Sequence, residues 1–228
     1  MLAIKRGVTV WLVLATTIVA PSTASAAPPD IDIWYGTTQT FGTVGQPQDV
    51  VNILGNIPNP DGVTLSYVLN PPGVSTPLTI GHLDAGPDDP DPANPGNPVW
   101  TNDIDTVDRR LSRTGDFNVD LDVALLDASA TDDVVRITAV GPHQSTSVDV
   151  TIEYETPPSW PLPYTIDWST VSAINDAAQV VDGIWSKSAR GIRTAQPGYD
   201  RLIAIGDVAW TEYEIEIPVT IHDFSVNG

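Results

Sequence analysis

The stretch WSKSARGIRTAQPGYDRLIAIGDVAWTEYEIEIPVTI, residues 185–221, is the part of the chain around which we expect the fold to be organised. Its last residues alternate apolar and polar side chains, a period typical of a β-strand with one buried face. The positions predicted to face inward are Tyr213, Ile215, Ile217, Val219 and Ile221. Glu212, Glu214 and Glu216 fall on the opposite face. We therefore predict that this stretch forms the opening hairpins of a β-sandwich.

The same alternation recurs upstream, from Ile31 to Tyr154, between turn-forming sequences. In residues 117–123 and 148–154, apolar side chains at every second position are separated by Asn, Asp, Thr or Glu. Turn formers such as Asn-Pro-Asp-Gly at 59–62 and Thr-Gly-Asp at 114–116 interrupt the pattern. About seven short strands, each with one face in water, are typical of an antiparallel sandwich. The sequence therefore predicts an all-β fold.

Residues 1–26 have the pattern of a secretory signal peptide. Lys5 and Arg6 precede an uncharged apolar run, and Ala24-Ser25-Ala26 matches a cleavage site. The alternative, a transmembrane anchor, needs about 20 apolar residues, which is more than this run provides. We therefore expect a secreted protein, in the medium, the periplasm or on the cell surface, with no membrane insertion after cleavage.

Charge and cysteine content exclude several classes of partner and site. The formal net charge is −19, with only 10 basic residues. Neutralising phosphates requires Lys and Arg, so a nucleic-acid partner is not expected. The chain has no cysteine, which excludes disulfides, zinc–thiolate sites and cysteine nucleophiles. Stability must then come from apolar cores, with calcium as the one cofactor left open.

Composition divides the mature chain into two modules. Residues 27–156 hold the first run of strands, interrupted at 82–103 by a loop rich in Pro and Asp. Residues 157–166 form a linker rich in Pro and Trp, for which an extended, semi-rigid spacer is expected. Residues 167–228 form the second module.

The first module resembles a known class of domain. The segments DVVNILGNIPNPDGVTLSYVLN, DFNVDLDVALL, DDVVRITAVG and STSVDVTIEYE are similar to bacterial immunoglobulin-like or fibronectin-III-like modules. The resemblance covers about residues 31–155 and implies an antiparallel Ig-like β-sandwich. Such modules mostly act as spacers or adhesive units, so the resemblance says little about activity.

The second module resembles the N-terminal strands of concanavalin A-like, laminin-G-like jelly rolls of large secreted bacterial proteins. The resemblance rests on Gly183-Ile184-Trp185, GIRT at 191–194, DRLIAIGD at 200–207 and WTEYE at 210–214. A jelly roll needs more chain than residues 167–228, so we expect an incomplete second β-sandwich and a truncated gene product. If the chain truly ends at Gly228, its unpaired edge predicts edge-strand self-association.

Three sets of residues are candidates for chemistry or binding. Glu212, Glu214 and Glu216 resemble the E-x-D-x-E strand of family 16 glycoside hydrolases, in which Glu212 and Glu216 would be the catalytic pair. The central Asp is a Glu here, and the motif precedes the strands that would build a cleft, so solvated carboxylates are expected instead. Calcium candidates are Asp84, Asp88, Asp89 and Asp91, although EF-hand spacing is lacking. Ligand-stacking candidates are Trp185, Trp210 and Tyr199, for which core packing is the competing interpretation.

Together these patterns predict a secreted, non-catalytic binding or scaffolding protein. A glycan or another surface protein is the expected partner, by analogy with the fold classes alone. A carbohydrate-active enzyme using the Glu212–Glu216 strand and a purely structural spacer remain the alternatives.

Overall fold

A computed structural model describes residues 27–43, 45–80, 114–126, 132–155, 162–195 and 201–221. Nearly all regular structure in these ranges is β-strand, which confirms the all-β prediction. The strands are β1 (Asp32–Ile33), β2 (Thr38–Phe41), β3 (Val50–Asn56), β4 (Thr64–Leu69), β5 (Thr76–Leu78), β6 (Asp116–Asp122), β7 (Asp133–Val140), β8 (Ser145–Tyr154), β9 (Gln179–Val180), β10 (Trp185–Ser188), β11 (Gly191–Thr194) and β12 (Ile203–Ala204). Two single-turn 3-10 helices, η1 (Val123–Leu125) and η2 (Ile174–Asp176), complete the described elements.

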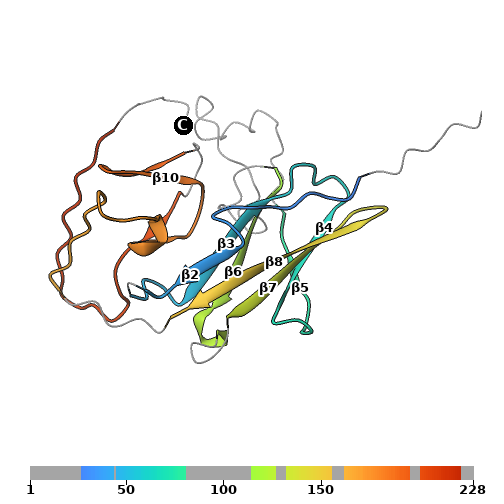
Figure 1. Cartoon of the computed structure of the whole chain (residues 1–228), viewed down its shortest axis with the longest axis horizontal. Coiled ribbons are helices and arrows are strands. Elements are labelled where there is room, and N and C mark those ends of the chain that lie inside the picture. Colours follow the sequence, from blue (N-terminus) through green and yellow to red (C-terminus); the bar gives the residue numbers. More distant parts are fainter. Residues whose placement is uncertain are drawn as a thin grey trace, which may run out of the picture.

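Two sheets form a sandwich from the first eight strands (Figure 1). One sheet has the order β2-β8-β7-β4-β5 and the other has the order β1-β3-β6. All pairings in them are antiparallel except that of β2 with β8. The chain leaves the smaller sheet after β1 and enters the larger one at β2. Tyr35 and Gly36 make this change of sheet with backbone φ values of 66° and 86°, a left-handed conformation that a non-glycine residue adopts only at some cost.

The sandwich core lies between the two sheets and follows the predicted alternation. Every second side chain of β6, β7 and the end of β8 is buried, while its neighbours face outward. The fully buried members include Phe117, Val119, Leu121, Val135, Ile137, Val150 and Ile152. The alternation stops earlier than expected at Val123, which lies in η1. The Asp122 carboxylate accepts a hydrogen bond from the backbone N–H of Ala124 at 2.8 Å and so turns the chain out of the strand.

Strand β3 differs from the others because both of its faces are covered. Val51 and Ile53 face the sandwich core, whereas Leu54 belongs to a second apolar cluster on the other side of the sheet. The buried residues that join Leu54 there are Trp34, Ile174, Ala178 and Val180. The C-terminal segment, by which we mean the described parts of residues 174–206, therefore packs on the outer face of the β1-β3-β6 sheet. It lies beside the sandwich in Figure 1.

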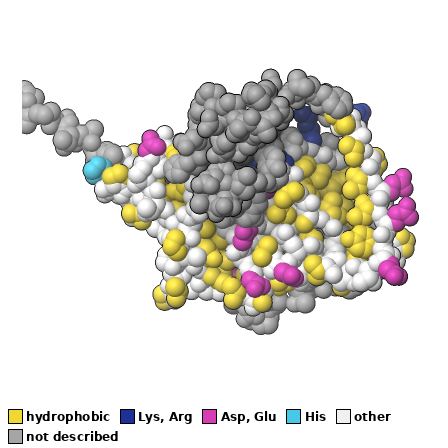
Figure 2. Space-filling model, turned by 180° about the vertical axis from the view of Figure 1, so that it is seen from behind, with side chains coloured by type: hydrophobic (Ala, Val, Ile, Leu, Met, Phe, Trp, Pro, Cys, Tyr) yellow, Lys and Arg dark blue, Asp and Glu magenta, His cyan; other side chains and the backbone are white. Residues whose placement is uncertain are grey.

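The C-terminal segment contains two small antiparallel pairs, β10 with β11 and β12 with β9. The strand expected over residues 212–221 is absent, and this prediction was wrong. Tyr213, Ile215, Ile217, Val219 and Ile221 do not face inward but are 50–76% exposed. The physical reason is that no neighbouring strand in the described ranges supplies a hydrogen-bonding ladder for them. Figure 2 shows hydrophobic side chains on the surface of the molecule.

The coverage of β3 can be tested with one core substitution. Leu54→Ala is expected to lower the free energy of unfolding by about 2–5 kcal/mol, because it leaves a cavity in the second cluster. Chemical denaturation would measure this loss. Val74→Ala is the control, since Val74 is 88% exposed, and should change stability by less than about 0.5 kcal/mol. Equal stability of the two variants would contradict the packing of the C-terminal segment on this sheet.

Candidate functional site

Buried polar side chains are concentrated where the C-terminal segment meets the β1-β3-β6 sheet, a region we call the junction. It comprises the outer face of that sheet and the described parts of residues 174–206. Buried polar groups are costly unless they are hydrogen-bonded. Their partners therefore show what holds the two parts together.

Asn52 is the centre of an amide network on β3. Its side chain is buried and donates to Asp120 and, at 3.3 Å, to Asn118 of the neighbouring strand β6. Its Oδ1 accepts from Gln48 and from the Nε2 of Gln179, which belongs to β9. The same Gln179 amide donates to the Val50 carbonyl at 2.8 Å. These bonds fasten β9 of the C-terminal segment to the backbone and side chains of the sandwich.

Tyr35 makes a second set of contacts across the junction. Its hydroxyl donates to the Gly183 carbonyl and accepts from the Trp185 backbone N–H, both at 2.8 Å. Burial is the main cause that raises the pKa of Tyr35 to about 12, and the nearby Asp182 carboxylate adds to the shift. The phenol therefore stays neutral at all physiological pH values.

Asp182 and Arg201 form a buried ion pair next to Tyr35. The Arg201 Nη1 lies 3.0 Å from Asp182 Oδ2, and the two side chains are only 6% and 2% exposed. The Arg201 side chain leaves no room for a side chain at position 183, because a Cβ at Gly183 would lie 2.3 Å from the Arg201 Cδ. Glycine is thus required at Gly183 both by this close approach and by its φ of 80°.

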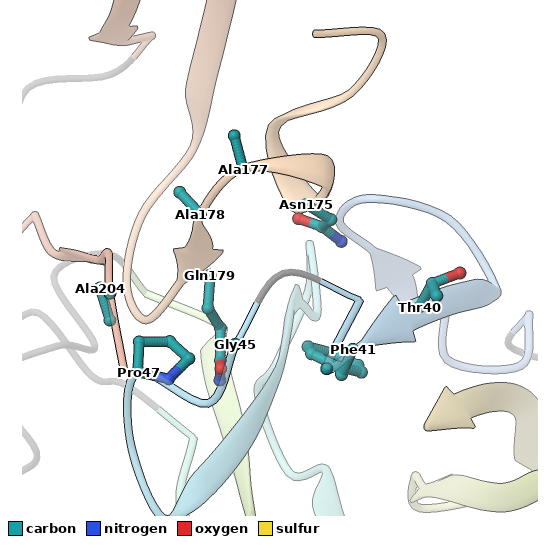
Figure 3. A pocket seen from close by; sticks show the side chains of 11 residues that line it. Thr40, Phe41, Gly45, Pro47, Asn175, Ala177, Ala178, Gln179 and Ala204 are labelled. Atoms are coloured by element: carbon teal, nitrogen blue, oxygen red, sulfur yellow. The ribbon is translucent and has the colours of Figure 1, made fainter. Parts of the chain in front are cut away.

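A small crevice of about 20 Å³ opens at the edge of the junction (Figure 3). The sandwich contributes its lining residues Thr40, Phe41, Gly42, Gly45 and Pro47, and the C-terminal segment contributes Asn175, Ala177, Ala178, Gln179, Ala204 and Gly206. No ionisable side chain is among them. A volume of this size has room for about one water molecule.

The predicted carboxylates lie apart from this crevice. Glu212, Glu214 and Glu216 are exposed, and no strand places them on a common sheet face. Glu212 has a φ of 53°, which breaks the extended geometry that the predicted motif needs. Asp84, Asp88, Asp89 and Asp91 lie outside the described residues. Within the described ranges, no group of three or more His, Asp or Glu side chains is arranged to hold a metal ion.

The aromatic candidates have different surroundings. Trp185 is half-buried against the second cluster, and its indole N–H donates to the Asp182 carbonyl at 2.8 Å. Trp210 makes an edge-to-face contact with Tyr213, with ring centroids 5.6 Å apart and an interplanar angle of 63°. Tyr213 is half exposed, so this pair presents aromatic surface to solvent. Tyr199 lies outside the described residues.

Several important junction residues were not identified from the sequence. Tyr35, Gln179 and Asp182 lie in segments without any motif, and Arg201 lies in the stretch 200–207, whose resemblance did not single it out. The run VVNIL at 50–54 did contain a signal, because it lacks alternation. A nearly continuous apolar run is the pattern of a strand that is buried on both faces.

No protein family matches the chain, and neither a curated protein nor a solved structure matches it significantly. In addition, the described ranges contain no helix of the length and apolarity needed to cross a membrane.

The buried ion pair should be far more sensitive to substitution than an exposed one. Arg201→Met leaves the Asp182 carboxylate buried beside an apolar group, and we expect a loss of about 3–5 kcal/mol in the free energy of unfolding. The double variant Asp182→Asn/Arg201→Met should recover much of it. The matched control is Arg136→Met, which breaks a 2.7 Å pair with Asp149 whose side chains are about half exposed and should cost less than about 1 kcal/mol. Similar losses for the two single variants would contradict this assignment.

The raised pKa of Tyr35 predicts that the free energy of unfolding falls at alkaline pH. Because its folded-state pKa is raised from 10.0 to about 12, the stabilisation by the neutral phenol is complete below pH 10 and is lost as the pH rises towards 12. Between these pH values the free energy of unfolding of the native sequence should therefore fall more steeply than that of Tyr35→Phe. Denaturation curves across this range would measure the difference. Parallel pH profiles for the two proteins would show that Tyr35 does not carry the effect.

Proposed function

We propose that this chain is a secreted, non-catalytic extracellular protein that binds or scaffolds surface material. The observation that carries this proposal is the use of the buried polar groups at the junction. Asn52 and Tyr35 are engaged in holding the C-terminal segment on the sandwich, and the buried Asp182–Arg201 pair is engaged within that segment. A scaffold needs such a fixed relative position of its parts, whereas an enzyme keeps polar groups available for substrate.

The first module is an immunoglobulin-like sandwich in this proposal. The sheet orders β1-β3-β6 and β2-β8-β7-β4-β5 support it, because they correspond to Ig strands A-B-E facing G-F-C with an added C′ strand. The first strand is divided between the two sheets. For the second module, the proposed relation to the opening strands of a jelly roll rests on the sequence resemblance, and the short pairs β10–β11 and β12–β9 support only its β-character.

The proposed export of the chain rests on the leader pattern of residues 1–26, which lie outside the described residues.

A glycan or a cell-surface molecule is the proposed ligand class. The Trp210–Tyr213 pair supports it, because exposed aromatic rings offer faces on which sugar rings can stack. A carbohydrate-active enzyme is the second candidate, and a spacer without ligand is the third. Calcium binding at Asp84, Asp88, Asp89 and Asp91 stays a proposal, which a calcium titration of thermal stability would test.

A glycan array combined with a reducing-end assay separates these three functions. We expect the exported chain to retain at least one polysaccharide and to release no reducing ends from it. Trp210→Ala should weaken retention about tenfold, which corresponds to ~1.4 kcal/mol. Glu212→Gln is the matched control, because it removes a candidate catalytic group without changing the aromatic pair. Turnover that Glu212→Gln abolishes would establish the enzyme, and a folded protein without retention or turnover would be a spacer.

A further inference from the structure

Residues 212–221, which we call the C-terminal strip, combine the composition of a strand with the exposure of a surface segment. Its apolar side chains are 50–76% exposed, including Val219 at 76% and Ile217 at 65%. Val and Ile at alternate positions favour strands because they pack against neighbours on a pleated surface. The strip runs along the edge of the molecule in Figure 1, and it pairs with no strand in the described ranges. An apolar, strand-forming segment without a ladder is a template for pairing with another strand.

The β10–β11 hairpin offers an edge of complementary charge. These two strands pair with each other and with no further strand in the described ranges. Arg193 of β11 lies opposite Ser186 on the exposed face, and Arg190 is exposed in the turn. On the inner face, Ile192 packs against the second apolar cluster. One face of the hairpin thus carries Ser186 and Arg193, and the other carries Ile192 together with Lys187, whose Nζ donates to the Trp168 carbonyl.

The strip matches both faces of this hairpin. Because side chains alternate along a strand, Glu214 and Glu216 share one face and Ile215 and Ile217 share the other. A strip that is added beside β11 would place its glutamates next to Arg193 and its apolar side chains on the side of Ile192. Opposite charges in neighbouring strands stabilise a pairing, and like charges destabilise it.

Pro218 restricts the strip to pairing along one side. In a strand, the backbone N–H groups of alternate residues point to opposite sides. Pro218 has no N–H, so the side that it shares with Glu214, Glu216 and Thr220 lacks a ladder donor. The other side, with the N–H groups of Tyr213, Ile215, Ile217, Val219 and Ile221, is complete. The strip can therefore be added to a sheet only as its edge strand.

We propose that two copies of this chain form a closed dimer in which the strip of each copy pairs with β11 of the other. Within one copy, the strip and the hairpin are both described, and no strand pairing joins them. Each copy thus carries one acidic donor strand and one basic acceptor edge, so two copies can exchange their strips reciprocally. Figure 2 shows acidic side chains that project beside hydrophobic ones at the edge of the molecule.

Reciprocal charge reversal tests this dimer. Light scattering after size exclusion is expected to give a dimer for the exported chain, and at least a tenfold higher dimer Kd for Arg193→Glu and for Glu214→Lys. Both residues are exposed, so circular dichroism and thermal unfolding should match those of the native sequence. An equimolar mixture of the two variants should form heterodimers, because each strip then meets an edge of opposite charge. The doubly substituted chain should dimerise with itself.

A second pair of variants tests the side of pairing. Ile215→Pro removes an N–H from the side that faces β11 and should abolish the dimer, whereas Thr220→Pro removes one from the side already interrupted by Pro218 and should preserve it. Three results would overturn the proposal, and the first is a monomeric native chain at about 100 μM, well above the μM Kd of modest protein complexes. The second is an equimolar mixture of the Arg193→Glu and Glu214→Lys chains that forms no heterodimer. The third is a dimer that none of the two charge reversals and the proline substitution on the side of β11 weakens. These readouts are independent of any glycan, so loss of the proposed ligand would leave this test intact.

Discussion

Burial of strand β3 on both faces is the constraint on which the rest of this molecule depends. Val51 and Ile53 complete the core between the two sheets, and Leu54 and Asn52 face the C-terminal segment. A polar side chain such as Asn52 is tolerated there only because each of its amide atoms has a partner. Strand β3 therefore joins the sandwich to the C-terminal segment, through apolar packing of Leu54 and amide hydrogen bonds of Asn52.

The polar contacts of the junction also determine what the described part of the molecule can do chemically. Tyr35 is neutral and has both of its hydrogen bonds occupied by the C-terminal segment, and the Asp182–Arg201 pair is removed from solvent. Such groups contribute specificity of docking more than net stability, because the desolvation of a buried pair offsets most of its attraction. The crevice of Figure 3 is lined by small or uncharged side chains and lies where the two parts meet. A scaffold with a binding surface is consistent with this distribution.

The predicted strands and site residues show which features a local sequence pattern can and cannot predict. Alternation identified β6, β7 and β8 because each of these strands has one face in the core and one face in water. The same alternation in residues 212–221 predicted a strand that is absent, because a strand also needs a neighbour for its backbone groups. The Trp185 indole lies at the junction, as packing would suggest, while Glu212 and Glu216 lie in the exposed strip. Asp84, Asp88, Asp89, Asp91 and Tyr199 lie outside the described residues.

The amino-acid sequence was sufficient to predict the all-β class and the inward residues of most sandwich strands, and its acidic, cysteine-free composition excludes several chemistries. These properties follow from composition and from a period of two, which are local. The bonds of Tyr35 to Gly183 and Trp185, of Gln179 to Asn52 and of Arg201 to Asp182 are seen only in the folded chain. The partners of Tyr35 and Gln179 lie more than a hundred positions away, and they come within bonding distance because the C-terminal segment packs on the outer face of the sheet that contains β3. A local pattern contains no information about such distances, because they are set by which faces of distant strands cover one another.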